Sequence, residues 1–323
     1  MSQTQTGFAR AVFASSVVCL CLALAPIVSH AQAWLPEKGS MSLSLDYTSS
    51  LNKKHFTSTG AEIDAGHTDM EALSISASYG LSDRFMIRAG LPYVTTRYRG
   101  SAPHPVEVDD GDEHSSVTDL QLSLHYQLMD GPFALAPYAA LVIPTNSYPR
   151  LGHASPGRRL NEYWIGFYAG RSLNDWIPRT YVQGRYNYAF VEGTAGIGHD
   201  RSNADLEIGY FLNPSWSVRV LGAWQETHGG VDVPVPLSSP LFQFHDILAD
   251  ESFLNIGGGT SWTINDRWSA YGLYMHALDG KNGHKVEHRV WVGFSYGLAS
   301  PLSVKRQAVI ATGDSRVPPP ESR

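Results

Sequence analysis

The chain has 323 residues and a mass of 35.4 kDa, with 24 lysines and arginines against 30 aspartates and glutamates. Its net charge of −6 gives no general attraction to nucleic acid, and its 2 cysteines cannot build a disulfide-rich scaffold. The mean hydropathy of −0.18 argues against a bundle of membrane helices, each of which needs about 20 apolar residues. We find no phosphate-binding loop, dinucleotide-binding glycine pattern or zinc-protease helix, so no cofactor is predicted.

The N-terminal segment has the pattern of a secretory signal peptide. A polar stretch with Arg10 precedes an apolar run over 11–28, and the small residues Ala31 and Ala33 flank Gln32 just before Trp34. This order of charged, apolar and small-residue regions predicts export and cleavage after Ala33. We therefore expect residues 1–33 to be removed, together with both cysteines.

The remaining chain alternates between apolar and polar residues. The clearest case is Leu120–Leu128, where every second side chain is large and apolar or aromatic. Successive side chains of a strand point to opposite faces, so each such segment predicts a strand with one apolar and one polar face. Twelve strands are predicted, near Met41–Tyr47, Leu73–Tyr79, Phe85–Val94, Leu120–Leu128, Phe133–Ile143, Tyr163–Arg171, Tyr181–Phe190, Leu206–Tyr210, Trp216–Gln225, Leu254–Ile264, Trp268–Ala277 and Val290–Tyr296.

Short and long connections alternate between these strands. The short ones are rich in the turn formers Asn, Asp, Ser and Pro, as in Leu81–Phe85 and Ile264–Trp268. The long ones are polar and include Thr48–His67, Thr95–Ser116 and Thr227–Ser252. Strict alternation is typical of outer-membrane β-barrels, which have tight periplasmic turns and long extracellular loops.

Aromatic residues cluster at the predicted strand ends, as expected for the two membrane–water boundaries. Strands can cross hydrocarbon only as a closed ladder with no free edge. The fold class predicted is therefore all-β: a closed antiparallel transmembrane barrel of about 12 strands over residues 34–298, in the outer membrane of a Gram-negative bacterium. Residues 299–323, with three consecutive prolines, are expected to form a flexible periplasmic tail.

If the apolar face meets lipid, the polar face lines the lumen. The residues expected there carry both signs of charge, and they are Asp46, Arg88, Asp119, Gln121, His125, Gln183, Arg185, Glu207, Arg219 and Arg289. Two interpretations remain open: a narrow lumen filled by ion pairs, or a polar path for a small solute.

Several motifs resemble an outer-membrane family associated with the meta-pathway of phenol degradation. They are Tyr79–Arg84, Gly90–Val94, Thr118–Leu120 and Leu141–Thr145, and the likeness runs from about Trp34 to Leu298. Members usually carry Gly after the Pro-Thr pair where Asn146 stands here, and the C-terminal tail is additional. The resemblance implies a barrel that passes small hydrophobic or aromatic compounds.

One pattern suggests an enzyme instead. His153 and Ser155 form a His-x-Ser pair like that of outer-membrane acyl hydrolases, and Glu162 or Asn161 could orient the histidine. The pair lies in a loop beside Pro156, and such a short pattern is common by chance, so no enzyme is predicted. A metal site is not predicted either. The acidic loop Asp109–His114 lacks the spacing of a calcium loop, and most of the 13 histidines are expected to be scattered over the long connections.

The sequence thus predicts a passive channel or transporter for small molecules, hydrophobic or aromatic ones among them. Its expected partners are outer-membrane lipid and a small solute; protein partners are not predicted. The rival functions are a membrane-embedded acyl hydrolase using His153 and Ser155, and a structural or adhesive barrel that acts through its long loops.

Overall fold

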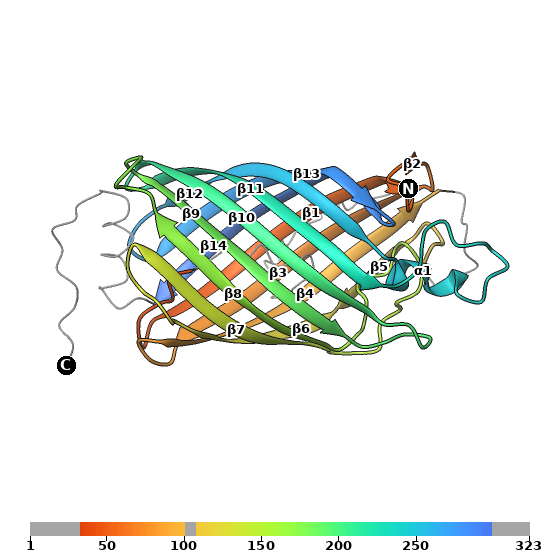
Figure 1. Ribbon diagram of the computed structural model, residues 1–323, viewed down its shortest axis with the longest axis horizontal. Coiled ribbons are helices and arrows are strands. Elements are labelled where there is room, and N and C mark those ends of the chain that lie inside the picture. The colour runs from red at the N-terminus through yellow and green to blue at the C-terminus, as the bar shows by residue number, and fades with distance from the viewer. Residues whose placement is uncertain (1–32, 101–107, 299–323) are drawn as a thin grey trace, which may run out of the picture.

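The computed structural model describes residues 33–100 and 108–298, which form one closed β-barrel (Figure 1). The predicted signal peptide up to residue 32 and the predicted tail from residue 299 lie outside this range. Twelve long strands build the wall: β1 (Met41–Phe56), β3 (His67–Gly80), β4 (Phe85–Arg99), β6 (Asp119–Tyr126), β7 (Phe133–Pro144), β8 (Glu162–Ser172), β9 (Thr180–Val191), β10 (His199–Asn213), β11 (Trp216–Gly229), β12 (Ser252–Thr263), β13 (Trp268–Lys281) and β14 (His284–Leu298).

Each long strand pairs antiparallel with its neighbours in the chain, and β14 pairs with β1 to close the barrel. Two short strands, β2 (Glu62–Ile63) and β5 (Glu113–Val117), extend this ladder within the long loops. A 3-10 turn (Phe242–Phe244) leads into the short helix α1 (His245–Leu248). In the described part of the chain, no helix is long and apolar enough to cross a membrane.

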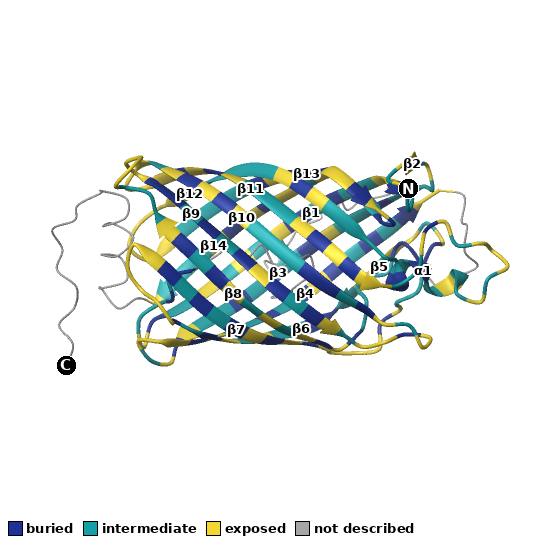
Figure 2. Cartoon of the chain, viewed as in Figure 1, coloured by how far each residue is buried: buried dark blue, intermediate teal, exposed yellow. Residues whose placement is uncertain are grey.

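Exposed and buried residues alternate along the strands (Figure 2). Leu122, Leu124, Ile208 and Val292 lie on the outer surface, between 38% and 50% exposed. Such a contiguous apolar surface suits lipid, not water. The predicted closed barrel of twelve strands, with its apolar side chains outward, is confirmed.

Hydrogen bonds within the short turns explain why these turns share the residues Asn, Asp and Ser. The side-chain oxygen of Asn213 accepts hydrogen bonds from the backbone N–H groups of Ser215 and Trp216 at 2.9 and 3.0 Å. Asn265 makes the same contacts with Arg267 and Trp268. These bonds replace those the backbone loses as it reverses. We call this end of the barrel the short-turn end, and the opposite one the long-loop end.

Several strands are longer than predicted, because polar residues continue the ladder beyond the apolar band. β1 runs to Phe56, into a segment predicted as a loop from Thr48, and β10 begins at His199 instead of near Leu206. Period-2 alternation marks only the part of a strand that faces two different media. Phe133–Ile143 alternates poorly and contains Pro137, yet it is a strand as predicted. Its ladder with β6 ends at Tyr138, next to Pro137, whose nitrogen cannot donate.

Arginine at adjacent positions of β6 tests which face meets lipid. Leu122 lies on the outer face near the middle of the strand, and its neighbour Gln121 lies on the inner face. We expect Leu122→Arg to lower the free energy of unfolding by about 2–4 kcal/mol, the cost of arginine at the bilayer midplane. Gln121→Arg should cost much less. Urea titration in lipid vesicles measures both, and equal costs would contradict the assignment.

Candidate functional site in the barrel lumen

A buried carboxylate, Glu207 of β10, is the centre of a polar network on the inner wall. It accepts hydrogen bonds from Tyr181 Oη at 2.6 Å and Gln183 Nε2 at 3.0 Å, both on β9. From β11, Arg219 Nη1 lies 3.3 Å from the other carboxylate oxygen. The carboxylate therefore has partners on both neighbouring strands, as a buried charge requires.

A second ion pair lies one step away on the same wall. Arg185 of β9 contacts Asp205 of β10 at 2.5 Å. Arg185 and Arg219 are each 7% exposed, so both guanidinium groups are largely shielded from bulk water. Charge pairs on strands β9–β11 thus make one side of the lumen strongly polar.

Three glycines of β12 allow this network to extend from β11 to β13 and on to β1. It thereby crosses the barrel seam, where the last strand, β14, pairs with the first, β1. The guanidinium of Arg219 lies 5.7 Å from the ring centre of Tyr271 on β13, and Tyr271 in turn donates a hydrogen bond to Asp46 on β1. The intervening strand has Gly257, Gly258 and Gly259. A Cβ atom at Gly259 would lie 2.3 Å from Leu273 Cδ2, so side chains from β13 lie over these glycines.

Two further arginines predicted for the lumen have polar partners of their own. Arg88 Nη2 donates to Ser76 Oγ at 3.3 Å, and Arg289 Nε donates to Ser50 Oγ at 3.2 Å. Gln121 is half-buried, on the face opposite the exposed Leu122.

An aromatic cluster faces the lumen on β6–β8. His125 stacks on Tyr138 with ring centres 5.1 Å apart, and Tyr168 lies 5.0 Å from Tyr138. His125 also shares a hydrogen bond of 2.8 Å with Ser123. Small alanines of β7 surround the rings, so this wall is smooth and mostly apolar. The rings of β6–β8 and the charge pairs of β9–β11 thus lie side by side on the inner wall, where β8 pairs with β9.

The segment before the first strand lies inside the barrel, which the sequence did not predict. We call residues 33–40 the N-terminal strap. Ala33 and Leu35 are buried against Met86 and against Tyr138 and Tyr168 of the aromatic cluster. At its other end, the backbone N–H of Gly39 donates to the carbonyl of Gly80. The strap therefore runs from the β6–β8 wall to the start of β1, at the short-turn end.

One glutamine holds the strap to the wall. Gln127 Oε1 accepts a hydrogen bond from the backbone N–H of Leu35 at 2.7 Å, and its Nε2 donates to the carbonyl of Ala33 at 2.9 Å. Trp34 Nε1 adds a bond to the carbonyl of Gly131 at 2.9 Å. Trp34 and Leu35 are apolar residues beside a polar turn, a signal that could have revealed the contact.

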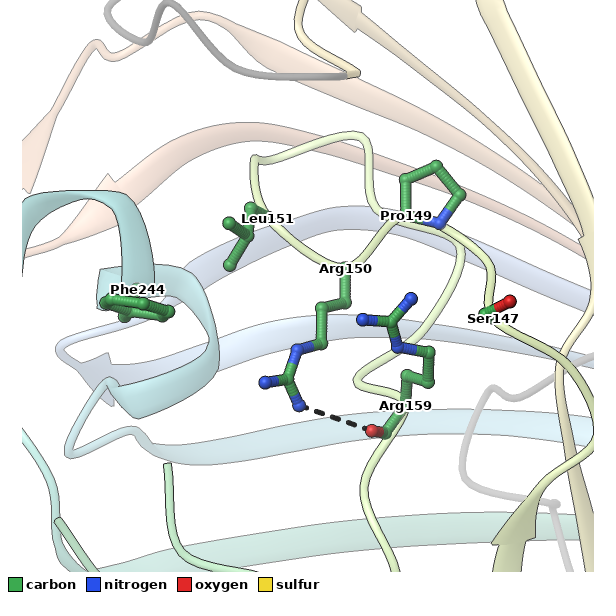
Figure 3. Close-up of a pocket in the computed structure, with 6 residues that line it drawn as sticks. All are labelled: Ser147, Pro149, Arg150, Leu151, Arg159 and Phe244. Atoms are coloured by element: carbon green, nitrogen blue, oxygen red, sulfur yellow. Dashed lines mark hydrogen bonds between the residues drawn. The ribbon is translucent and has the colours of Figure 1, made fainter. Parts of the chain in front are cut away.

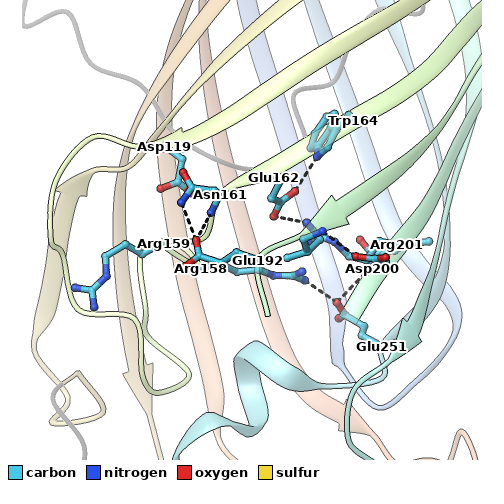
Figure 4. Close-up of polar contacts among 12 residues, drawn as sticks. Asp119, Arg158, Arg159, Asn161, Glu162, Trp164, Glu192, Asp200, Arg201 and Glu251 are labelled. Atoms are coloured by element: carbon cyan, nitrogen blue, oxygen red, sulfur yellow. Dashed lines mark hydrogen bonds and ion pairs between the residues drawn. The ribbon is translucent and has the colours of Figure 1, made fainter. Parts of the chain in front are cut away.

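The connection between β7 and β8, residues 145–161, packs against the barrel wall at the long-loop end (Figure 4). Its Tyr148 Oη donates to Asp119 at 2.5 Å, and Arg158 lies 3.6 Å from Glu251. Just beyond it, Glu162 forms a buried ion pair with Arg201 and accepts from Trp164 Nε1 at 2.8 Å.

A pocket opens between this loop and the 3-10 turn (Figure 3). It is lined by Ser147, Pro149, Arg150, Leu151, Arg159 and Phe244. Arg150 donates to the backbone carbonyl of Arg159 at 3.4 Å, so its guanidinium is directed along the pocket. Two arginines without a carboxylate in the lining make this pocket cationic.

The structure does not assemble the hydrolase motif as the alternative function requires. Ser155 Oγ donates to the backbone carbonyls of Gly157 and Pro149, at 2.7 and 3.1 Å. Glu162 is engaged with Arg201, and His153 contacts Asp246 and His284 instead. The three residues thus have different partners, and no nucleophile–base–acid relay connects them.

His153 is held rigidly, although it lies in a loop. The Asp109 carboxylate accepts from the backbone N–H groups of His153 and Ala154, at 3.1 and 3.0 Å. Burial alone would lower the pKa of the His153 imidazole, but the Asp246 carboxylate, 3.0 Å from Nδ1, outweighs it and raises that pKa. Burial would likewise raise the pKa of Asp246, yet His153 holds it well below its usual range.

The expectation that the loop histidines are scattered is wrong for His55, His153 and His245. The structure brings them together with His284, from four segments far apart in the sequence. No spacing within one segment could have revealed this, because each segment supplies only one histidine.

No family model and no curated protein matches the chain, but its fold is similar to solved structures. An outer membrane channel from Pseudomonas putida F1 is 16% identical with a TM-score of 0.64, over 82% of this chain and 97% of that one. The beta domain of the Bordetella autotransporter BrkA (11%, TM-score 0.48) covers 80% and 99%, and the CymD monoaromatic hydrocarbon channel (11%, TM-score 0.41) covers 83% and 90%. The chain thus has the fold of an outer-membrane β-barrel.

Proposed function

We propose that the protein is an outer-membrane channel through which small molecules diffuse down their gradients. The observation that carries the proposal is the contrast between the two faces of a closed barrel. The outer face is apolar, whereas the inner face combines buried ion pairs such as Arg219–Glu207 with the aromatic cluster of His125, Tyr138 and Tyr168. A structural barrel has no need of an aromatic cluster beside buried charge pairs on its inner face.

The same contrast favours small aromatic solutes that carry a polar or anionic group. The rings on β6–β8 offer a stacking surface, and the arginines of the loop pocket attract a negative group at the entrance. The resemblance of the sequence to the phenol meta-pathway family supports the aromatic class. The structural neighbour CymD is itself described as a monoaromatic hydrocarbon channel.

The orientation follows from the loops. We propose that the short-turn end faces the periplasm and the long-loop end faces the outside, as in other outer-membrane barrels. Export would use residues 1–33 as a cleaved signal peptide, and residues 299–323 would then extend into the periplasm.

Conductance in planar lipid bilayers tests the channel. We expect discrete ion currents, which benzoate reduces reversibly and more strongly than an aliphatic carboxylate of similar size. Barrel that folds correctly but gives no current above that of protein-free bilayers would contradict the proposal, and would favour the structural or adhesive role. The rate of ester hydrolysis should equal the protein-free background rate in both the native barrel and the Ser155→Ala variant.

A further inference from the structure

Four histidines and one aspartate meet at the long-loop end, on the inner side of the barrel seam. We call them the histidine cluster: His55 of β1, His153 of the 145–161 loop, His245 and Asp246 of α1, and His284 of β14. His55 and His284 are direct cross-strand neighbours where the first strand pairs with the last, and their ring centres lie 4.3 Å apart. The wall thus positions two of these rings, and Asp109 fixes the loop that carries His153.

The potential ligand atoms form two triplets that share His153. The ligand atoms of His55, His153 and His284 all lie within 4.8 Å of one another, and so do those of His153, His245 and Asp246. In the first triplet, His153 Nδ1 is 3.3 Å from His284 Nε2. Ligands about 2.1 Å from a tetrahedral metal ion are about 3.4 Å apart, so this distance already matches a coordination shell.

The imidazole of His55 is buried without a hydrogen-bond partner among the described residues. It is 5% exposed, and neither of its two ring nitrogens has such a partner in the described part of the chain. A buried polar atom left unpaired costs about 1–3 kcal/mol. A metal ion between the rings would give one of these nitrogens its missing contact.

We propose that the histidine cluster binds a divalent transition-metal ion of the zinc class. His55, His153 and His284 supply three imidazole nitrogens, the three-histidine set with which zinc keeps a fourth position for a non-protein ligand. Asp246 lies beside this set, 3.0 Å from His153 Nδ1, and His245 Nε2 lies 3.6 Å from the same carboxylate. Imidazole nitrogen suits Zn²⁺ better than Ca²⁺ or Mg²⁺, which take oxygen ligands.

Such an ion would fasten the 145–161 loop to the barrel seam. Two of its ligands lie on β1 and β14, which pair directly and whose ladder is irregular between Leu51 and Lys54. The third comes from the 145–161 loop, where His153 also pairs with Asp246 of α1. The site would therefore hold this loop and α1 against the seam at the long-loop end, in addition to the proposed channel function.

Metal titration of the purified, untagged barrel tests this site. We expect Zn²⁺ to bind with a stoichiometry of one in calorimetry, and Co²⁺ to give the intense visible absorption of four-coordinate cobalt. Changing a residue that contacts a metal ligand, but not the metal, weakens metal binding by about 10–100-fold. His55→Gln removes a ligand and should weaken Zn²⁺ binding by more than that. His288→Gln is the matched control: His288 is on the same strand as His284, but it is exposed and bonded to Tyr274.

Native protein that shows no saturable Zn²⁺ binding overturns the proposal, and so does His55→Gln protein that binds Zn²⁺ as tightly as the native barrel. Heat-modifiable gel mobility reports whether each variant is folded. If His55→Gln does not fold, the cobalt spectrum of the native barrel decides, because scattered surface histidines would give the weak absorption of six-coordinate cobalt. Conductance is measured separately, so a channel without a metal site would remain distinguishable.

Discussion

Replacing Glu207 by leucine is expected to lower the free energy of unfolding by about 3–5 kcal/mol, the usual cost of leaving a buried charge without its partner. Arg219 would lose the carboxylate 3.3 Å away, and its side chain is only 4% exposed. Tyr181 and Gln183 would lose their acceptor as well. Urea-induced unfolding in lipid vesicles measures the change.

A double-mutant cycle separates the ion pair from side-chain packing. Arg219→Leu alone should destabilise the barrel by a similar amount, because Glu207 would then be a buried charge without its partner. The double variant Glu207→Leu/Arg219→Leu should recover much of the loss, because an apolar pair of similar volume leaves no uncompensated charge. Costs that simply add would show that the two residues are independent, and would contradict the network described above.

The same pair should set the ion selectivity of the channel. Glu207→Gln leaves Arg219 as an excess positive charge on the inner wall, so the current should shift toward anions. Arg219→Gln leaves Glu207 in excess, so the current should shift toward cations. Reversal potentials in a salt gradient measure both shifts, and a shift of the same sign in both variants would place the pair outside the conducting path.

The sequence was sufficient to predict the wall of the barrel, because alternation is a local property. Whether Leu122 or Gln121 faces outward follows from their positions within one strand, and the turn at Asn265 follows from one side chain bonding its own backbone. Each strand could therefore be recognised without knowledge of its neighbours, and the closed sheet then follows from the need to satisfy every backbone group in lipid.

Features that join distant segments could not be predicted in the same way. The partners of His153 come from β1, α1 and β14, and they meet only because two long loops fold over one end of the barrel. Tyr271 meets Arg219 because glycines occupy the strand between them, a contact that depends on register. Such contacts cannot be recognised from the sequence, because the residues that make them are far apart along the chain.

The N-terminal strap should restrict flow, so releasing it is expected to raise the single-channel conductance. In the processed chain, which would begin at Trp34, Gln127→Ala removes the hydrogen bond that the backbone N–H of Leu35 donates to the Gln127 side chain. The lost bond costs about 1 kcal/mol, and a buried N–H left unpaired costs about 1–3 kcal/mol. Planar bilayer recordings measure the effect, with Gln121→Ala, an inner-face change on β6 just before Gln127, as the control.

A single cysteine reports whether the strap has moved. Both native cysteines, Cys19 and Cys21, lie within the predicted signal peptide, so Leu35→Cys would carry the only thiol of the processed chain. Leu35 is 6% exposed, and its cysteine replacement should react slowly with a polar thiol reagent unless Gln127→Ala is also present. If labelling becomes fast while conductance stays at its original value, the strap is not the barrier, and the constriction must lie among the ion pairs of β9–β11.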